Sequence, residues 1–477
     1  MTTYRVENFG CRATQADAAR IEQELVAAGC MPAASGTAAD VIVFNTCTVT
    51  AAADLEARQA IAATARRESN AKIIVTGCYA QRAPEEIAAL PGVTWVVGNS
   101  HQREIAKLVP GAERQTSCPA NPDEPLIQIA ERKDGEFHVF NDRAGRDSLD
   151  FRAKILGGGA EELGARGDVF GGVSPGSHTR PILKIQDGCD NRCAYCVIPF
   201  VRGKSRSMAP DAVVSEIHRL NDGGTEEVVL SGINLGSYGR DLSPRVELLH
   251  LLRLIIEQTS VARVRLSSIE PMDVTQELVE FAAASERIAH HFHMPLQSGS
   301  DRTLAGMRRW YRSAHYAEHA QLIRRILPDA AIGADVIAGF PGETEKDHQA
   351  TLQFIESTPL DYLHVFSFSE RPGTAAASFT NRVPEKEVQR RAKGLRKLSE
   401  KKQAAFRASQ TGKTMRVLTL RTKSMDRAQN LTRAISSNYL DVRVRGDWPA
   451  NRWLDVRIIS AGTGPIEAEL LLPAAAD

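Results

Sequence analysis

The sequence has no apolar stretch that approaches the roughly 20 residues needed to span a bilayer. Its start, Met1–Arg5, lacks a basic region followed by an apolar run, the pattern of a secretory leader. We therefore expect a cytoplasmic protein with no membrane partner. The chain also has almost no net charge, +1 with 25% charged residues, so its overall electrostatics does not indicate a nucleic-acid partner. Any such surface must be local.

Cysteine is scarce as well, with eight residues in 477. This density argues against a disulfide scaffold. Six of the eight cysteines lie in chemically suggestive places, which indicates metal ligands in a reducing compartment. Cys30 and Cys118 stay unassigned, and we expect them to be structural thiols. The length of the chain predicts about three domains.

Three cysteines, Cys189, Cys193 and Cys196, lie close together in one segment. Three thiolates fill three corners of a four-iron cluster and leave one iron free for a small ligand. A zinc site needs a fourth ligand nearby, and the nearest histidine, His218, falls in a predicted helix after the loop. The spacing favours a four-iron cluster over a partial zinc site or a chance grouping.

Alternating apolar runs and helical patterns predict an α/β fold. Over residues 1–112, runs such as Val41–Phe44 and Lys72–Val75 predict a doubly wound parallel sheet with flanking helices. Residues 113–180 include eight glycines between Gly157 and Gly176, which predicts a linker or insertion. A short strand pair is expected there around Phe137–Phe140.

Residues 181–382 contain six strand candidates that alternate with helices, which predicts an open six-unit βα barrel. The candidates are Ile182–Ile185, Glu227–Leu230, Arg263–Ser267, His290–Met294, Gly333–Ala338 and Tyr362–Phe368. Residues 383–410 predict one long polar connecting helix. Residues 411–477 alternate apolar and polar positions, as is typical of a small β-barrel.

Three more cysteines, Cys11, Cys47 and Cys78, each come just after a predicted strand of the N-terminal sheet. The loops at the carboxyl ends of parallel strands share one edge of the sheet, so the three thiols could meet there. Cysteine is also a small hydrophobe that is common at buried strand ends. Geometry alone leaves both interpretations open.

Polar groups at the ends of the barrel strands are candidates for a cofactor site. A glycine turn follows the second strand, where the backbone can approach a ligand closely. Hydroxyl, carboxylate, imidazole and amide groups reach other strand ends, where they could fix ribose or methionine moieties. The candidates are Gly232, Asn234, Ser268, Glu270, His293 and Gln297. An ordinary turn, helix capping and packing are the alternatives. Arg371, at the end of the barrel, is expected to meet an anionic group.

Two segments have a local excess of positive charge. Val383–Gln410 has nine Lys or Arg against three Glu, and Lys413–Arg457 has ten against four Asp. Such an excess can neutralise phosphates and give salt-sensitive RNA binding. A solvated helix face is the alternative for the first segment.

The Cys189-x-x-x-Cys193-x-x-Cys196 spacing, with Tyr195 before the third cysteine, resembles the signature of the radical S-adenosylmethionine (SAM) superfamily. Asn8–Cys11, Asn45–Thr50 and Thr76–Gln81 resemble the amino-terminal motifs of the methylthiotransferases within it. The resemblance covers nearly the whole chain and leaves out mainly the glycine-rich segment. One departure is Arg12–Gln15, where relatives often carry an Asn.

The resemblance implies two [4Fe–4S] clusters and SAM as cofactors, with the auxiliary cluster held by Cys11, Cys47 and Cys78. It implies that SAM chelates the free iron of the other cluster and is cleaved to a 5′-deoxyadenosyl radical, which removes hydrogen from C2 of an adenine. Sulfur would come from the auxiliary cluster and the methyl group from a second SAM. Gly232 falls where radical SAM enzymes bind the methionine amino group, and the tail resembles a TRAM-like RNA-binding barrel.

Gln186–Asn191, Arg202–Ser207 and Ser231–Gly236 most resemble the branch that acts on threonylcarbamoyladenosine beside the anticodon of tRNA. A base in an anticodon loop is single-stranded or easily splayed, so it is readily presented to a barrel. The alternatives are the isopentenyladenosine branch, a methylthiotransferase of a ribosomal-protein aspartate, and a non-catalytic iron–sulfur protein that binds RNA. The reaction needs an electron donor and a sulfur donor, which the sequence does not identify.

Overall fold

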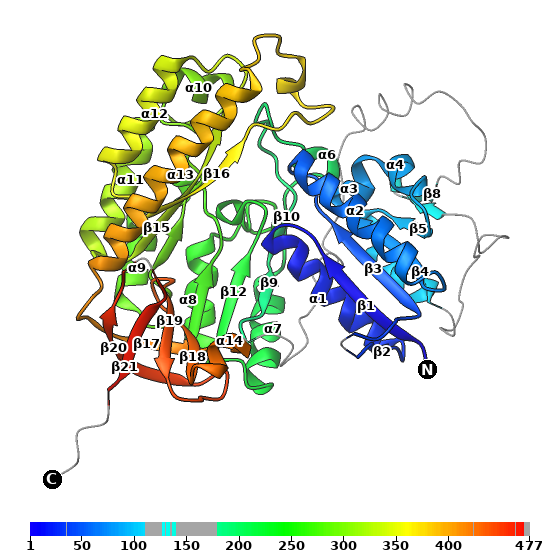
Figure 1. Cartoon of the computed structure of the whole chain (residues 1–477), viewed down its shortest axis with the longest axis horizontal. Helices are drawn as coiled ribbons and strands as arrows, with labels where there is room; N and C mark the ends of the chain where they lie inside the picture. The colour runs from blue at the N-terminus through cyan, green and yellow to red at the C-terminus, as the bar shows by residue number, and fades with distance from the viewer. Residues whose placement is uncertain are drawn as a thin grey trace.

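The structure, a computed structural model, describes residues 1–34, 36–109, 126–128, 130–133, 136–139, 179–422, 424–462 and 464–471. An N-terminal α/β unit, a central barrel and a C-terminal β-barrel follow one another along the chain (Figure 1). The fold class predicted from the sequence is confirmed. The glycine-rich segment 157–176 and Cys118 lie outside the described residues.

The N-terminal unit is a parallel sheet in the order β2-β1-β3-β4-β5-β6. The strands are β1 (Thr3–Asn8), β2 (Met31–Pro32), β3 (Val41–Thr46), β4 (Lys72–Gly77), β5 (Val93–Val97) and β6 (Leu126–Gln128). The helices are α1 (Arg12–Ala27), α2 (Ala51–Arg67), α3 (Cys78–Arg82), α4 (Pro84–Ala88) and the 3-10 helix η1 (Asn99–Leu108). Within the predicted insertion, β7 (Ala130–Lys133) pairs antiparallel with β8 (Glu136–Val139).

Both faces of this sheet are buried, which explains the continuous apolar runs of its strands. In β3, Val43 packs with Ile21 of α1 on one face, whereas Phe44 packs with Ile61 of α2 on the other. The sheet is therefore doubly wound, as predicted. Because α1 follows β1 and α2 follows β3 on opposite faces, the point between these two strands is the ligand-binding crevice of such folds.

The central unit has six parallel strands, and all six predicted strands are confirmed with ends shifted by one or two residues. They are β9 (Ile182–Lys184), β12 (Glu227–Ser231), β13 (Arg263–Leu266), β14 (His291–His293), β15 (Ala331–Ala338) and β16 (Tyr362–Ser367). Two three-stranded sheets, β9-β12-β13 and β14-β15-β16, are joined by parallel bridges from Val264 to Ile288 and from Ser268 to His293. Among the described residues β9 and β16 do not pair, so the barrel is open.

Helices cover the outside of this open barrel and enclose its apolar core. They are α7 (Pro210–Asp222), α8 (Leu248–Gln258), α9 (Gln276–Ala284), α10 (Asp301–Gly306), α11 (Ser313–Ile326) and α12 (Glu345–Ser357). The predicted long polar helix is α13 (Glu385–Ala408), which runs along β15 and β16 (Figure 1).

The C-terminal unit is a closed barrel in the order β17-β18-β19-β21-β20, as predicted. It comprises β17 (Thr414–Thr419), β18 (Leu431–Ser436), β19 (Asp441–Arg445), β20 (Trp453–Ser460), β21 (Ile466–Leu470) and the short helix α14 (Ser424–Ala428). In β19, Val442 and Val444 point into the core. Arg265 donates to the Ser436 carbonyl at 2.8 Å and holds this barrel against the central one.

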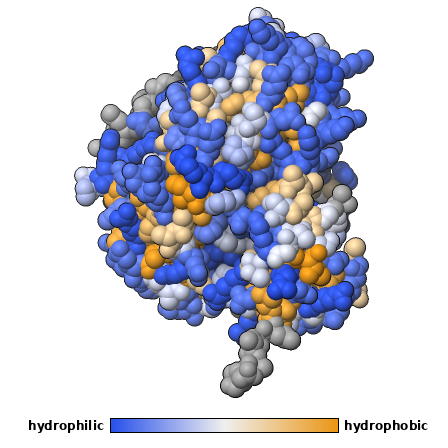
Figure 2. All heavy atoms as spheres, turned by 90° about the vertical axis from the view of Figure 1, so that its left-hand side faces the viewer, coloured by the Kyte–Doolittle hydropathy of each residue, from blue (hydrophilic) through white to orange (hydrophobic). Residues whose placement is uncertain are grey.

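The face of the molecule on the side of α11 to α13 is largely hydrophilic, with apolar residues in small separate patches (Figure 2). None of the helices described is both long and apolar enough to cross a membrane.

Candidate active site

The loop with Cys189, Cys193 and Cys196, the barrel cysteine triad, leaves the barrel directly after β9. Its base is an antiparallel pair of β10 (Gln186–Asp187) and β11 (Arg206–Ser207). The middle of the loop is fixed from the far side of the barrel, because the Ala194 N–H donates to the Met307 carbonyl at 2.9 Å. The three thiols are partly exposed.

A buried cation lies beside the barrel cysteine triad. The Arg309 guanidinium donates to Cys193 Sγ at 3.2 Å and also pairs with the carboxylate of Glu270. Burial raises the pKa of Cys196 to about 12 and also raises the pKa of Cys189. Thiols with a raised pKa ionise when a metal takes the thiolate, and a neighbouring guanidinium offsets the negative charge of a thiolate-bound cluster. The donor set fits an iron–sulfur cluster.

Three buried polar atoms at the ends of barrel strands have no hydrogen-bond partner among the described residues. They are Ser231 Oγ, Asn234 Oδ1 and Ser267 Oγ. An unpaired buried polar group costs about 1–3 kcal/mol, so three of them at one end of a barrel indicate a polar ligand. SAM, with its amino, carboxylate and ribose hydroxyl groups, fits this requirement.

The predicted glycine turn after β12 is held in place by the side chain of Gln186. A Cβ at Gly232 would lie 2.9 Å from Gln186 Oε1, so the glycine makes room for that side chain. Gln186 Oε1 accepts the Asn234 N–H at 2.8 Å, and its amide donates to the Gly188 carbonyl at 2.8 Å. Gln186 thus couples the turn to the loop of the barrel cysteine triad. Cofactor contacts of Gly232 and Asn234 stay a prediction.

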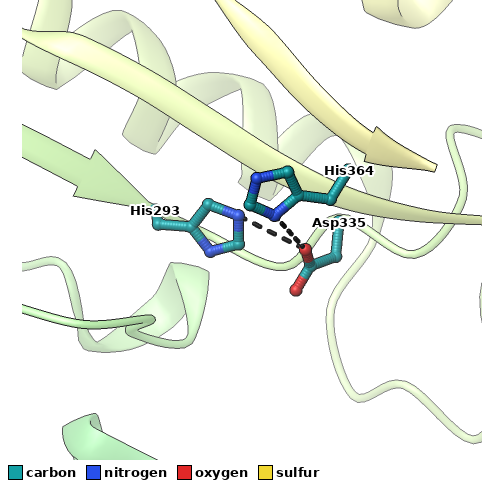
Figure 3. Close-up of side chains that lie close together, drawn as sticks. All are labelled: His293, Asp335 and His364. Carbon is teal, nitrogen blue, oxygen red and sulfur yellow. Dashed lines mark ion pairs between the residues drawn. The ribbon is translucent and has the colours of Figure 1, made fainter. Parts of the chain in front are cut away.

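His293, Asp335 and His364 come from three adjacent strands and point toward one another inside the barrel (Figure 3). Asp335 Oδ1 lies 3.3 Å from His293 Nε2 and 3.3 Å from His364 Nδ1. Burial opposes ionisation of Asp335, yet the two imidazoles hold its pKa below the usual range. Ser268 Oγ lies 2.9 Å from His293 Nδ1 and fixes the ring.

Gln297 is held by its backbone next to this group. Its φ is +66°, in the left-handed region, and its N–H donates to the Asp335 carbonyl at 2.7 Å. Strained backbone of this kind often accompanies ligand sites. The structure therefore brings Ser268, His293 and Gln297 together, while Glu270 faces Arg309.

Cys11, Cys47 and Cys78, the N-terminal cysteine triad, follow β1, β3 and β4 at one edge of the sheet. Gly10 has a φ of +115°, and a Cβ there would lie 2.4 Å from Cys47 Cβ, so only glycine allows the first loop to approach the second. Burial, together with the neighbouring thiols of Cys11 and Cys78, raises the pKa of Cys47 to about 12. The three loops thus converge.

Arg202, at the end of α6 (Ile198–Arg202), ties the two triads together. Its Nε donates to Cys78 Sγ at 3.2 Å, and it pairs with Asp17 of α1 at 2.8 Å and with Asp187 at 3.1 Å. Lys184 pairs with the same two carboxylates. All these side chains except the thiol are charged and buried, and removal of one partner from such a network costs about 3–5 kcal/mol.

The spread of the thiols distinguishes a cluster from a single-ion site. Over the described parts of the chain, His293, Asp335 and His364 are the one set of three metal-ligating groups whose ligand atoms all lie within 4.8 Å of one another. Two imidazoles and a carboxylate are a possible set for one divalent ion. Both cysteine triads are wider, as a four-iron cluster requires, because each thiolate binds a different iron.

Sequence reasoning gave no role to Arg202, Arg309 or Asp335. The sequence did contain a signal for Arg202. Lys184 and Asp187 are charged residues in or next to an apolar strand, and buried charges need partners of opposite charge. No such signal existed for Arg309, which reaches Cys193 from a distant loop. Arg371, which was expected to meet an anionic group, pairs with a carboxylate of the chain itself, Asp54 of α2, at 2.6 Å.

Two family models match the chain. The uncharacterized protein family UPF0004 matches residues 3–98, which carry the N-terminal cysteine triad, and the radical SAM superfamily matches residues 183–355. The second match implies SAM and a [4Fe–4S] cluster as cofactors. A radical SAM methyltransferase, TsrM from Kitasatospora setae, has a similar fold, with a TM-score of 0.50 and 15% identity over 79% of this chain and 74% of that one.

Full-length relatives are closer in sequence. The chain is 34% identical to threonylcarbamoyladenosine tRNA methylthiotransferase MtaB of Aquifex aeolicus, over 92% of this chain and 96% of that protein. It is 32% identical to the protein of the same name from Bacillus subtilis, over 97% and 95%. It is also 32% identical to tRNA-2-methylthio-N(6)-dimethylallyladenosine synthase of Syntrophobacter fumaroxidans, over 98% and 95%. The chain belongs to the radical SAM tRNA methylthiotransferase family.

Proposed function

We propose that the protein transfers a methylthio group to C2 of N6-threonylcarbamoyladenosine beside the anticodon of tRNA. The observation that carries the proposal is the contact of Cys78 with the segment that follows Cys196. Cys78 packs against Val197 and Val201 and accepts a hydrogen bond from Arg202. An enzyme that both activates C–H and inserts sulfur needs two such sites on one substrate cavity. The names of the relatives in Aquifex aeolicus and Bacillus subtilis support threonylcarbamoyladenosine as the substrate base.

The barrel cysteine triad would hold the cluster that binds SAM, and the N-terminal cysteine triad would hold an auxiliary [4Fe–4S] cluster as the source of sulfur. When bound, these groups supply the oxidant for an unactivated C–H bond, the sulfur and the methyl group. Ser231, Asn234 and Ser267 would donate to or accept from the polar groups of SAM. The reaction also needs an electron donor and a sulfur donor, whose identities the proposal leaves open.

The residues of the chain supply position. Arg371 and Asp54 fasten the N-terminal unit to the segment that follows β16, and the Ala51 N–H donates to Ser369 Oγ at 2.9 Å beside them. These contacts would hold the N-terminal cysteine triad beside the carboxyl end of the barrel strands. A reactive oxidant is useful only when its target C–H is held against it, so this rigid placement would supply much of the rate.

The C-terminal barrel would bind the RNA backbone. A hollow of about 430 Å³ on this barrel is lined by Arg421, Arg427 and Trp448 among others, which combines cations with an aromatic surface for a base. It lies away from the cysteines, so it suits a docking role. On α13, the exposed Lys393, Arg396 and Lys397 have no carboxylate partner in the described chain. RNA binding should weaken steeply with salt.

Nucleoside analysis of tRNA tests the proposal. A strain that lacks its own methylthiotransferase should gain 2-methylthio-N6-threonylcarbamoyladenosine when it expresses this chain. A double variant, Cys47→Ala with Cys78→Ala, should leave threonylcarbamoyladenosine unchanged. The proposal would be overturned if no tRNA base were methylthiolated and a ribosomal-protein aspartate were modified instead. Absence of reductive SAM cleavage by the purified protein would leave only the non-catalytic RNA-binding alternative.

A second candidate substrate is the isopentenyl (dimethylallyl) adenosine of tRNA. The synthase of Syntrophobacter fumaroxidans, whose name contains this base, aligns over 98% of the chain at 32% identity. The same analysis separates the two substrates, because the two methylthiolated nucleosides differ in mass.

A further inference from the structure

The side chain that follows Cys11 reaches a junction of all three units. Arg12 is the first residue of α1, and its Nη2 donates to the hydroxyl of Tyr439 of the C-terminal barrel at 3.3 Å. Tyr439 in turn stacks on His291 of β14 with 4.5 Å between ring centroids, and His291 Nε2 lies 2.7 Å from the Tyr362 hydroxyl. Tyr439 is held with a φ of +65°, in the left-handed region. A side chain adjacent to the N-terminal cysteine triad is thus connected through Tyr439 to β14 of the central barrel.

Positive charge is in excess at this junction. The guanidinium carbons of Arg12, Arg180 and Arg265 lie 5.7, 5.9 and 5.2 Å from the centroid of the Tyr439 ring. Glu227 is the carboxylate that pairs with Arg180, Arg263 and Arg265. Asp335 also acts on Tyr362, and it pairs with His293 and His364. Burial opposes ionisation of Tyr439, yet these guanidinium groups lower the pKa of its phenol.

Arg12 is the guanidinium of this group that lacks a carboxylate partner. Arg265 and Arg263 are further held by backbone carbonyls of Ile435, Ser436 and Ser437. Arg12 has no carboxylate partner among the described residues, and it donates a hydrogen bond to the Tyr439 hydroxyl. A half-buried guanidinium with free donors in a positive surrounding is a binding site for an oxyanion, because a carboxylate or phosphate accepts two of its N–H groups.

We infer that Arg12, oriented by Tyr439, binds the free carboxylate of the threonylcarbamoyl group and thereby selects the base. This inference rests on the proposed function. A threonine linked through its amino group keeps its carboxylate, whereas a dimethylallyl substituent is uncharged. C2 and N6 lie on the same ring of adenine, so a base whose C2 faces the Cys11 loop brings its N6 substituent within reach of Arg12. The apolar substituent would leave a desolvated cation without a partner, which is how a polar site rejects an apolar analogue.

Binding of three anticodon stem-loop RNAs to the reconstituted holoenzyme tests the inference. The RNAs carry threonylcarbamoyladenosine, its methyl ester or plain adenosine, and the readout is fluorescence anisotropy. Wild type should bind the acid about tenfold more tightly than the ester, the usual size of one charged hydrogen bond. Arg12→Gln should bind acid and ester equally, and its affinity for the ester should match that of wild type. Arg12→Lys should keep part of the preference, because it keeps the charge but loses the two-pronged geometry.

Two controls separate fold from recognition. Arg67→Gln changes an exposed arginine of α2 with a side chain that is 65% exposed, and it should alter none of the three affinities. Iron content of Arg12→Gln should equal that of wild type. The inference is overturned if Arg12→Gln still prefers the acid tenfold. It is also overturned if Arg12→Gln weakens all three RNAs by one factor with a shallower salt dependence, since the anion is then an RNA phosphate.

Methylthiolation assays with the acid RNA and with a fourth RNA that carries dimethylallyladenosine distinguish failure of the inference from failure of the proposed function. Methylthiolation of the acid RNA by wild type, together with an unchanged preference in Arg12→Gln, overturns the inference and leaves the function standing. A wild-type enzyme that methylthiolates the dimethylallyl base alone and binds acid and ester equally overturns both.

Discussion

The barrel cysteine triad comes from a single short loop, whereas the N-terminal cysteine triad comes from three loops separated by 36 and 31 residues. In the first, chain connectivity keeps the thiols close even in the unfolded protein. In the second, parallel pairing of β1 with β3 and of β3 with β4 brings the thiols to one edge. The first site is local in sequence and the second is a product of topology.

This difference decides what each site depends on. The barrel loop is closed by its own hairpin of β10 and β11, and the contacts that fix it further, from Met307 and Arg309, come from the same unit. The N-terminal cysteine triad needs the whole sheet, a glycine at position 10 and the guanidinium of Arg202 from another unit. Substitutions that perturb packing should therefore empty the N-terminal site first.

The largest effects should come from the ligands themselves. Cys193→Ala should retain about half of the roughly eight irons per chain and abolish reductive cleavage of SAM. Cys78→Ala should retain a similar amount of iron, keep SAM cleavage and lose methylthiolation. Iron and sulfide analysis after anaerobic reconstitution, together with 5′-deoxyadenosine release, measures both. Loss of all iron in either variant would mean that the two sites do not fold independently.

A glycine pair tests how far the N-terminal site depends on close packing. Gly10 and Gly29 both adopt left-handed backbone, but a Cβ at Gly29 meets nothing within 4 Å, whereas one at Gly10 meets Cys47. Gly29→Ala should cost about 1 kcal/mol of unfolding free energy and no iron. Gly10→Ala should lose about half of the iron and keep SAM cleavage. Equal iron in both variants would show that the loops can move apart without losing the cluster.

The strand alternation, the open barrel and the closed C-terminal barrel could be predicted from the sequence because each unit buries its strands in a recognisable way. Continuous apolar runs such as Val41–Phe44 indicate strands that are buried on both faces. Alternation of apolar and polar residues, as in β19, indicates a barrel strand with one face in the core and the other toward solvent. Strand ends were right within two residues because polar and glycine residues follow each run.

The sequence predicts only those parts of the site that follow from the spacing of residues along the chain or from the order of the strands. The short spacing of Cys189, Cys193 and Cys196 identifies the barrel cysteine triad directly. The rule that loops after parallel strands share one edge of the sheet predicts that the N-terminal cysteine triad can meet. The partners Arg202, Arg309 and Arg12 act across units, over 124, 116 and 427 residues of chain to Cys78, Cys193 and Tyr439. Nothing in the local pattern around an arginine says which distant thiol or phenol it will face. His364 was missed because one histidine in a strand looks like any half-exposed residue.

The stability of the contact between the central unit and the C-terminal barrel should depend on pH through Glu227. Burial opposes ionisation of Glu227, but Arg265 and Arg263 lower its pKa to about 2, below the ordinary value of about 4.3. The folded-state pKa is depressed, so the stability that Glu227 contributes is present above about pH 4.3 and is lost as the pH falls toward 2.

Glu227→Gln should therefore cost a few kcal/mol of unfolding free energy at pH 7, measured by urea unfolding followed through the signal of Trp453 at the seam. The difference in unfolding free energy between wild type and variant should narrow as the pH falls from about 4.3 toward 2. Glu356→Gln, which breaks the exposed pair with Lys401, is the matched control and should show no measurable change at any pH. A gap that is constant with pH would mean that Glu227 is already protonated in the folded protein.

The smallest effect should come from a cysteine that is buried but is no ligand. Cys30 is 6% exposed and Cys78 is 2% exposed, so burial does not tell them apart. Cys30 packs in the core beside Ile21 and Leu25, whereas Cys78 faces Arg202. Cys30→Ala should cost about 1 kcal/mol for the lost sulfur contacts and should keep all iron and full methylthiolation. Iron loss in Cys30→Ala as large as in Cys78→Ala would show that general loosening of the sheet empties the site, and the contrast between a local and a topological site would then lose its basis.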